Sequence, residues 1–572
     1  MIQFPKKWVY FFFLLFFILP VELSYSAGPM WESTTNVPVS DPVYRKLDKL
    51  IAAGLIKDTI YGQRPWSRGE IARLISIALK ARTKQLEEGG PDAENFILDQ
   101  ILDELPGEYH EELVARGDQP GIVASYKFHP LEEVRLDQVF LDSSFRPVLV
   151  NNNLGLIDME VNPLVGYREG RHYVDGNTVA FETVHRANLS KHFSLYANPR
   201  FESLFPESGS NSASAVANQL YGKFAFHNFE LEVGRDEVIW GQGAHGGVLA
   251  SDNARGLDMV RLTTSAPFHH PWIFKYLGPS KYTFFLANLG PEYVLKNAFL
   301  YDFAASFKPA SFLELGFEHE VTLSGDGAPN VGFANAISEF FLVRRTGGSG
   351  VDAGPNVADH RLGFNIRGSI PQLNGMVLYV ENILEDLGRH SFYHQFVDLA
   401  AWQVGIYMPL LTSDGQDDLR LEYQYMAPIY GRHSSWTSGL SENRLSRGSD
   451  LGPDAESFRL EWNHDLDTGT FFQGAAIFEQ RDGDLFTQPL SSEGTAVDVV
   501  KTVDNPTEDR FRLTSAVVWP CKLWLDVKPQ AGYEHVWNTN FVQGASRNNF
   551  LAEIQLVFKP ESYLSRNKLA QQ

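Results

Sequence analysis

Basic residues and cysteine are both scarce in this chain of 572 residues. Lysine and arginine total 49 against 70 aspartate and glutamate residues, which gives a formal net charge of -21. A nucleic-acid binder carries a basic surface, so nucleic acid is excluded as an expected partner. Cys521 is the only cysteine, and the chain can therefore form neither an intrachain disulfide nor a metal cluster built on several cysteines.

Long apolar runs are missing after the amino terminus. Lys6 and Lys7 precede the apolar segment WVYFFFLLFFILP, and Ser24-Tyr25-Ser26 follows. This order is typical of a secretory signal peptide, which we expect at residues 1–26. An uncleaved anchor is the alternative, but the run falls short of the roughly 20 residues that a spanning helix needs. We expect an exported chain that is either soluble or crosses a membrane with strands alone.

After a linker at residues 27–39, residues 40–116 are predicted to form a small helical bundle. Asp41-Pro42 places a capping carboxylate before a proline at the first helical position. Ser67 and Glu70 form a capping box for a second helix, and a third is expected from about Pro91. The apolar residues at helical spacing are Leu47, Leu50, Ile51 and Leu55, then Ile71, Leu74, Ile75, Ala78 and Leu79, then Ile97, Leu98, Ile101, Leu102 and Leu105.

One piece of this bundle, RPWSRGEIARLI, resembles the second half of an S-layer homology repeat, a module associated with cell-wall polymers. The resemblance implies wall binding through Arg64, Trp66 and Arg68. Such modules usually occur in several copies, and this chain has one. The alternative is a helical cap whose side chains pack on their neighbours.

Residues 120–558 show alternating apolar and polar positions, the pattern of strands with one apolar and one polar face. Soluble β-sandwiches alternate too, but here the apolar face is rich in aromatics and the polar face carries Arg and Glu in strand after strand, which a dry core disfavours. We therefore predict a mainly β fold, a large antiparallel transmembrane β-barrel of roughly 16 to 18 strands, followed by a polar tail at residues 559–572. The pattern is clear in DHRLGFNIRGSIP, DLRLEYQYM, ESFRLEW, DRFRLT and the final NNFLAEIQLVF, which sets Phe550, Ala552, Ile554, Leu556 and Phe558 on one face.

The stretch Phe229 to Thr264 joins two such strands through the glycine-rich connection GQGAHGGVLASDNARG. We expect Glu230, Glu232 and Arg235 on the polar face or its rim. Bacterial barrels have short periplasmic turns and long outer loops, so the tight His227-Asn228 turn is expected in the periplasm. The connection would then lie at the extracellular mouth or fold into it. The long segments 344–359 and 430–454 are also expected outside.

Two stretches, VPVSDPVYRKLDKLIAAGLI with GQRPWSRGEIARLI and ELEVGRDEVIWGQGAHGGVLASDNARGLDMVRL, resemble the Wzi family of capsule-assembly outer-membrane proteins. The resemblance implies a monomeric barrel in the bacterial outer membrane, surrounded by its lipid, with a periplasmic helical bundle. It also implies a lectin that attaches or organises capsular or extracellular polysaccharide, with peptidoglycan or export machinery as further partners. The tail beyond Phe558 departs from the usual aromatic end.

Sugar binding needs planar polar groups for hydroxyls and aromatic faces for the apolar side of a ring. The glycine-rich region concentrates such groups, and Trp240 and His245 are the preferred ligand contacts because they lie in or beside the loop. Arginine additionally suits anionic sugars. The alternative is an internal ladder that plugs the barrel. The candidate residues are Arg235, Asp236, Trp240, His245, Asp252, Asn253, Arg255, Asp258 and Arg261.

Other functions are less well supported by the sequence. A diffusion porin with a wall-associated helical module and an outer-membrane enzyme are the alternatives. Asp359, His360 and Glu381 lack a nucleophile motif, and paired lumen residues are expected there instead. Thr412–Asp418 and Ser324–Asn330 have oxygen ligands but not the spacing of a calcium loop, which favours exposed acidic loops. With no phosphate loop, zinc signature or nucleophile elbow, we expect no enzyme, cofactor or metal.

Overall fold

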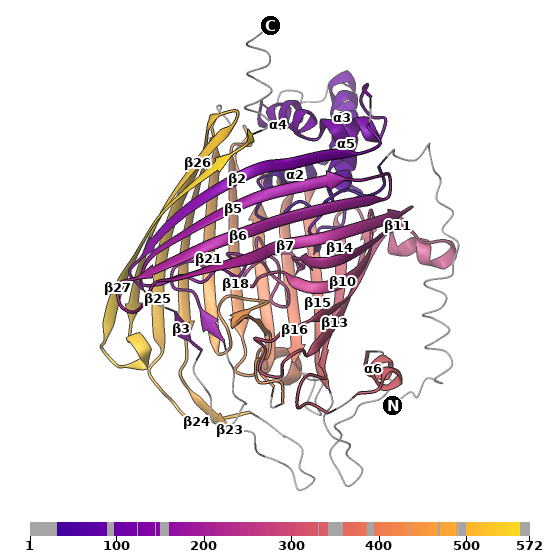
Figure 1. The fold of residues 1–572 in the computed structure, drawn as a ribbon. Coiled ribbons are helices and arrows are strands. Elements are labelled where there is room, and N and C mark those ends of the chain that lie inside the picture. Colours follow the sequence, from indigo (N-terminus) through magenta and orange to yellow (C-terminus); the bar gives the residue numbers. More distant parts are fainter. Residues whose placement is uncertain are drawn as a thin grey trace.

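The computed structural model describes residues 31–88, 96–122, 124–143, 145–148, 159–329, 331–340, 358–385, 394–433, 435–466, 470–487, 489 and 499–560. Within these ranges, eighteen antiparallel strands close into one barrel (Figure 1). Strand β2 closes it, since it pairs with β5 on one side and with the last strand, β27, on the other. The predicted fold class is confirmed, at the upper end of the expected strand number.

The wall strands follow one another in chain order. They are β2 (Lys127–Leu141), β5 (Gly176–Asn188), β6 (Phe193–Pro206), β7 (Ser212–Phe226), β8 (Phe229–Asp236), β10 (Leu257–Thr264), β12 (Pro279–Asn288), β13 (Phe299–Ala310), β14 (Leu313–Leu323), β15 (Ala358–Ile370), β16 (Met376–Glu385), β17 (Ala400–Met408), β18 (Asp417–Met426), β21 (Ala455–Asp465), β22 (Phe471–Arg481), β25 (Glu508–Lys522), β26 (Leu525–Trp537) and β27 (Ser546–Phe558).

Shorter elements lie in the connections and in the lumen. The short strands are β1 (Gln63–Arg64), β3 (Arg146–Pro147), β4 (Glu160–Val161), β9 (Ile239–Trp240), β11 (Phe268–His269), β19 (Ser441–Glu442), β20 (Leu445–Ser446), β23 (Leu485–Thr487) and β24 (Val500–Val503). The helices are α2 (Val43–Ala52), α3 (Arg68–Glu88), α4 (Phe96–Glu108), α5 (His110–Ala115), α6 (Phe333–Phe340) and the short η1 (Trp272–Leu277), η2 (Pro371–Leu373), η3 (His394–Asp398) and η4 (Thr539–Phe541).

The two faces of the wall differ as the alternation predicts. Along β18, Leu421 is 41% exposed outside the barrel, whereas the neighbouring Arg420 and Glu422 are buried inside. The last strand likewise turns Phe550 and Ile554 outward. An apolar exterior with a charged, hydrogen-bonded interior is the arrangement of a barrel that faces lipid.

Helices α2 to α5 pack against one end of the barrel, shown at the top of Figure 1. The helices share one apolar core, in which five residues are fully buried: Leu47, Leu50, Ile71, Leu74 and Leu105. No helix in the described ranges is both long and apolar enough to cross a bilayer.

The predicted helix caps are partly confirmed. The Asp41 carboxylate accepts a hydrogen bond from the Val43 N–H at 2.8 Å, as expected of a cap. At α3, the Glu70 N–H donates to Ser67 Oγ at 3.3 Å, but the Glu70 carboxylate pairs with Arg73 instead of returning to the Ser67 backbone. The capping box is therefore half formed, because the nearby guanidinium competes for the carboxylate. The expected helix start at Pro91 lies outside the described residues.

Ion pairs attach the bundle to the barrel. Arg45 pairs with Asp418 of β18 at 2.8 Å, and Lys49 pairs with Asp465 of β21 at 2.6 Å. The bundle end is also the end of the tight turns, because the His227 N–H donates to Glu32 of the chain leading into α2. The long connections lie at the opposite end.

Candidate functional site

The glycine-rich connection between β8 and β10 does not stay at the mouth but folds into the lumen. Ile239 and Trp240 form β9, which pairs with Arg64 and Gln63 in β1. The Gly241 N–H donates to the Gly62 carbonyl at 3.0 Å. Ile239 is fully buried in the same apolar cluster as the helices. The connection therefore runs through the barrel to the bundle and forms a plug, which we define as residues 237–256.

Glycine is needed where the plug passes the wall strand β16. The Glu381 carboxylate accepts the Val248 N–H at 2.9 Å. Gly241 has φ of +96°, and a Cβ there would lie 2.3 Å from a Glu381 oxygen. A Cβ on Gly247 would lie 1.9 Å from the other oxygen. At Gly241, only glycine permits both the positive φ and the close approach to the Glu381 carboxylate. The glycine-rich composition that argued against a helix therefore also allows the plug to contact the wall.

A second connection, between β18 and β21, fills the lumen beside the plug. Tyr430, Trp436 and Leu440 are fully buried, and the Tyr430 hydroxyl donates to the Val248 carbonyl. The Ser251 N–H donates to Arg447 O at 2.7 Å. Segment 430–454, which is expected at the outer side, does not project from the barrel, since its apolar residues pack into the lumen. Residues 341–357 of the other long segment lie outside the described part of the chain.

Two of the candidate residues belong to a buried polar network under the plug. Asp236 accepts hydrogen bonds from Asn36 at 2.7 Å and from Arg261 at 2.9 Å. Arg261 also donates to Glu232 at 2.7 Å. Asp236 is 0% exposed. These groups bond to one another, as expected if the polar residues form an internal ladder that plugs the barrel.

Trp240, Asn253 and Arg255 hold the plug in place. The Trp240 ring is 2% exposed and packs on Phe285, with ring centroids 5.6 Å apart. Asn253 donates to the Ser446 carbonyl at 3.0 Å, and Arg255 pairs with Glu442 at 2.7 Å. Trp240 therefore has no free face for a sugar ring.

Arg235 and Asp258 lie apart from the other candidates. They are opposite each other on β8 and β10, and Arg235 Nη2 donates to the Asp258 carboxylate at 2.6 Å. Their neighbours on the same face, Val233 and Val260, are exposed apolar residues of the outer wall. Arg235 is expected on the polar face or its rim, and it does not lie on the polar face. Strand alternation turns it outward, where its partner Asp258 neutralises its charge near the rim.

His245 is the most exposed of the candidates inside the barrel, with 30% of its side chain accessible. Its ring stacks on Tyr167 with centroids 4.4 Å apart and planes 5° apart, and Nδ1 lies 3.3 Å from Asp252 Oδ2. Burial opposes a charge on this ring, but the negative charge of Asp252 and its hydrogen bond outweigh burial and raise the pKa of His245 above its ordinary value. The raised pKa favours a charged ring at neutral pH, although the nearby Arg459 acts in the opposite direction.

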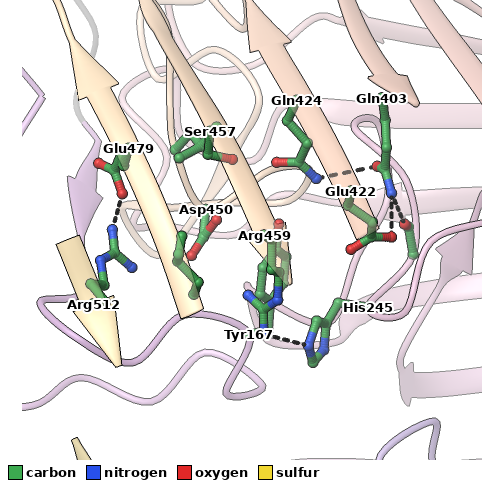
Figure 2. Close-up of a pocket in the computed structure, with 13 residues that line it drawn as sticks. Tyr167, His245, Gln403, Glu422, Gln424, Asp450, Ser457, Arg459, Glu479 and Arg512 are labelled. Atoms are coloured by element: carbon green, nitrogen blue, oxygen red, sulfur yellow. Dashed lines mark hydrogen bonds and ion pairs between the residues drawn. The ribbon is translucent and has the colours of Figure 1, made fainter. Parts of the chain in front are cut away.

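His245 lines a cavity between the plug and the inner faces of β18, β21, β22 and β25 (Figure 2). Both arginines of the lining are paired, since Arg459 contacts Glu461 and Arg512 contacts Glu479. About 420 Å³ of space, part of it open solvent, lies between these side chains. The enclosed part admits roughly one or two water molecules. A sugar ring does not fit there without displacing the plug.

A group of residues that the sequence patterns did not reveal lies on the small sheet of β3, β4, β19 and β20. Phe145 and His172 have ring centroids 4.9 Å apart, and His172 Nε2 lies 3.1 Å from the Asn443 carbonyl. Arg444 is 47% exposed and pairs with Glu160 at 2.8 Å. We call these five residues the mouth cluster. It combines an aromatic pair with planar polar groups.

His172 in the mouth cluster has the opposite electrostatic state to His245. Burial lowers the pKa of His172 below its ordinary value, and the charge of Arg444 acts in the same direction. The ring is therefore neutral at neutral pH. Asn443 and Arg444 both have positive φ, as the two central residues of a tight hairpin require. His172 is 271 residues away from Asn443, so no local pattern could link them.

The residues proposed for wall binding have partners inside the protein. Arg64 donates to the Gly243 carbonyl of the plug at 2.9 Å. Trp66 is 2% exposed and lies against Tyr44. Arg68 pairs with Glu112 at 2.5 Å and stacks over Tyr109. The packing alternative therefore accounts for the contacts of all three residues.

The residues considered for catalysis or calcium have structural partners as well. Arg361 is 0% exposed and pairs with Asp359, Glu320 and Glu385, which confirms the expected pairing in the lumen. His360 lies 3.4 Å from Glu339. In the loop before β18, Thr412 Oγ1 donates to Asp414 at 2.6 Å and stabilises the turn.

Comparison with known proteins agrees with this architecture. The family model for the capsule assembly protein Wzi matches residues 157–551, which is well over half of the chain and includes the plug. The chain belongs to the Wzi family. A search among curated proteins gave no match.

Among solved structures, the Escherichia coli outer-membrane protein Wzi has the same fold. It is described as a carbohydrate-binding β-barrel involved in group 1 capsule assembly. The two chains are 15% identical with a TM-score of 0.59, over 93% of this chain and 99% of that one. Pseudomonas aeruginosa OprD and OccK5 also match, at 10% and 11% identity and TM-scores of 0.38 and 0.40. They cover 76% and 77% of this chain, and 95% and 100% of their own.

Proposed function

We propose that this protein binds capsular or extracellular polysaccharide at the surface of the bacterial outer membrane and helps to assemble it there. One observation carries the proposal. The lumen of a lipid-facing barrel is filled by the plug and by the connection between β18 and β21. A barrel filled in this way is unsuited to diffusion, so its useful surface is the outer end. The family's role in capsule assembly and the carbohydrate binding described for the Escherichia coli relative support this function.

The orientation follows from the two ends of the barrel. The helices and the tight turns share one end, and the long connections share the other. Outer-membrane barrels have short periplasmic turns. We therefore assign the bundle to the periplasm, where it would meet peptidoglycan or export machinery, and the long connections to the cell surface. The protein would act as a monomer and carry out no chemical step.

The mouth cluster is the proposed contact for polysaccharide. Phe145 and His172 offer an aromatic surface for the apolar side of a sugar ring. The neutral His172, Asn443 and Arg444 offer donors and acceptors for hydroxyls. Arg444, being half exposed, can exchange part of its bond with Glu160 for a ligand without unfolding the sheet. The sugar would therefore bind above the plug.

The nine candidate residues take a different role in this proposal. Asp236, Trp240, Asp252, Asn253, Arg255 and Arg261 position the plug and the small sheet, and Arg255 does so through Glu442 in β19. His245 lies beneath the surface beside Tyr167. Arg235 and Asp258 face the membrane rim. We assign none of these to the first contact with polymer.

The experiment is a deletion strain complemented with variants. Deletion is expected to release polymer into the medium while total synthesis is unchanged, because attachment and not polymerisation is lost. Arg444→Gln is expected to release polymer at normal levels of folded barrel, whereas Arg235→Gln, its matched control on the outer wall, should retain it. Unchanged cell-associated polymer in the deletion strain would refute the function. A large current through the purified protein in a planar bilayer would support a porin instead.

A further inference from the structure

The connection between β10 and β12 differs from the other short connections at the bundle end. It spans residues 265–278 and carries helix η1, which Figure 1 shows as the pink helix standing out beside β11. It begins beside the tight turn after β7, because the Ser265 N–H donates to Asn228 O at 3.0 Å. The Asn228 side chain also bonds to both backbone groups of Ala266. The connection therefore leaves the barrel at the level of the bundle.

One side of this connection packs on the outer wall. Phe268 of β11 pairs with Ser280 of β12, and its ring lies 5.9 Å from the Tyr282 ring. His270 Nε2 lies 2.7 Å from the Tyr282 hydroxyl oxygen. Tyr282 points outward, since the adjacent Thr283 is buried inside the barrel. Helix η1 is therefore held against the lipid-facing side of the wall.

The other side of η1 is apolar and uncovered. Trp272 is 74% exposed, Ile273 is 73% exposed and Tyr276 is 72% exposed. No residue of this helix is buried. Lys275 lies among them, with Nζ 5.2 Å from the centre of the Tyr276 ring. Large apolar side chains with a lysine and a tyrosine at their edge are typical of segments at a membrane interface.

The exposed face of η1 continues an aromatic belt on the outer wall. Phe193 is 51% exposed, Phe226 is 53% exposed and Phe229 is 43% exposed. All three lie next to tight turns at the bundle end, and Phe226 and Phe229 flank the turn that contacts Ser265 and Ala266. Aromatic girdles of barrels lie at the two membrane interfaces. The belt therefore marks the level of one interface, and η1 lies at that level.

We propose that Trp272, Ile273 and Tyr276 insert into the phospholipid leaflet on the bundle side of the barrel. In this role η1 is an interfacial anchor outside the β-wall, and it fixes how deeply the bundle end of the barrel is immersed. Phospholipid is the occupant because the face is continuous with the aromatic belt and carries Lys275 where lipid headgroups lie. The anchor is independent of polysaccharide binding.

Depth-dependent quenching tests the anchor. Cys521→Ser removes the only native thiol, and Ile273→Cys then carries a polarity-sensitive NBD label at a residue whose side chain makes few contacts. The full chain is placed in nanodiscs of phosphatidylcholine and phosphatidylglycerol, one barrel per disc. We expect blue-shifted emission that lipids with a doxyl group near the headgroup quench more strongly than lipids with a deep doxyl group.

Two further labels calibrate the result. A label at Leu231→Cys on the outer wall should show the blue-shifted emission of a lipid environment. A label at Lys84→Cys on α3, where the lysine side chain is 75% exposed, should show the emission of a label in water. Emission at position 273 that matches position 84 and resists both doxyl lipids would overturn the proposal. Shielding that appears only with two barrels per disc would overturn it too, because the face would then bind a second copy instead of lipid.

Discussion

Trp240 in the plug pairs through its backbone with Gln63 in the segment between helices α2 and α3. A connection that begins at the end of the long loops thus reaches the helical bundle at the opposite end. Ile239, next to Trp240, is buried in the apolar core of the bundle. The bundle, the plug and the barrel wall therefore form one cooperative unit, and we expect damage to the plug to affect the whole barrel.

Replacing Trp240 with alanine should destabilise the barrel strongly. The ring is buried against Phe285, so its loss leaves a cavity that costs about 3–5 kcal/mol. Thermal unfolding in detergent, followed by the heat-dependent shift of the barrel on a gel, measures the effect. The matched control is Trp272→Ala, which removes an exposed ring and should leave the unfolding temperature nearly unchanged. Equal stability of the two variants would contradict the buried position of Trp240.

Replacing Arg361 with methionine should also cost stability, for an electrostatic reason. Arg361 is 0% exposed and forms ion pairs with Asp359, Glu320 and Glu385. Removing one partner from a buried ion pair costs about 3–5 kcal/mol, because the remaining charges are left unpaired. Chemical denaturation measures this difference. Arg235→Gln breaks a pair whose Asp258 is 55% exposed, and its cost should be below about 1 kcal/mol. Similar costs for both variants would contradict the assignment of the two pairs to different faces.

The plug should loosen at alkaline pH. The folded-state pKa of His245 is raised by Asp252, so the stabilisation from the charged ring is complete below about pH 6.5 and is lost as the pH rises through the folded-state pKa. His245→Gln removes this contribution at every pH. The difference in unfolding temperature between the native chain and His245→Gln should therefore be largest near neutral pH and shrink by about pH 10. A difference that is independent of pH would show that His245 is not charged.

Replacing Arg68 with alanine separates packing from wall binding. Arg68 pairs with Glu112 and lies over the Tyr109 ring, so its loss should make α3 and α5 more sensitive to proteolysis. Sedimentation with purified peptidoglycan should not change. Lys84→Ala, an exposed residue of the same helix, is the control and should alter neither property. Reduced sedimentation of a stably folded Arg68 variant would restore the wall-binding interpretation.

The wall of the barrel could be predicted from the sequence because alternation is a local property. Leu421 outside and Glu422 inside follow directly from a period of two. The cap at Asp41 is also local and was predictable. At Arg235 the residue type and the alternation point to different faces. Its charge suggested the polar face, although the alternation itself placed it outside with Val233.

The plug and the mouth cluster could not be predicted in this way. Strands β1 and β9 have two residues each, too few for any period to show, and their pairing joins distant parts of the chain. The glycines excluded a helix, but their other role depends on Glu381 of the wall. The mouth cluster depends on the small sheet that brings His172 to Asn443. Contacts of this kind are set by the closed barrel and not by neighbours in sequence.

The most direct test is the binding of purified mature protein to the capsular or extracellular polysaccharide of its own strain, measured by biolayer interferometry on an immobilised polymer. We expect saturable binding by the native chain, at least about tenfold weaker binding by Arg444→Gln at an unchanged unfolding temperature, and native affinity for Arg235→Gln. Absence of saturable binding by the folded native protein would contradict the central claim. Equal affinity of all three proteins would leave polysaccharide binding in place but remove it from the mouth cluster.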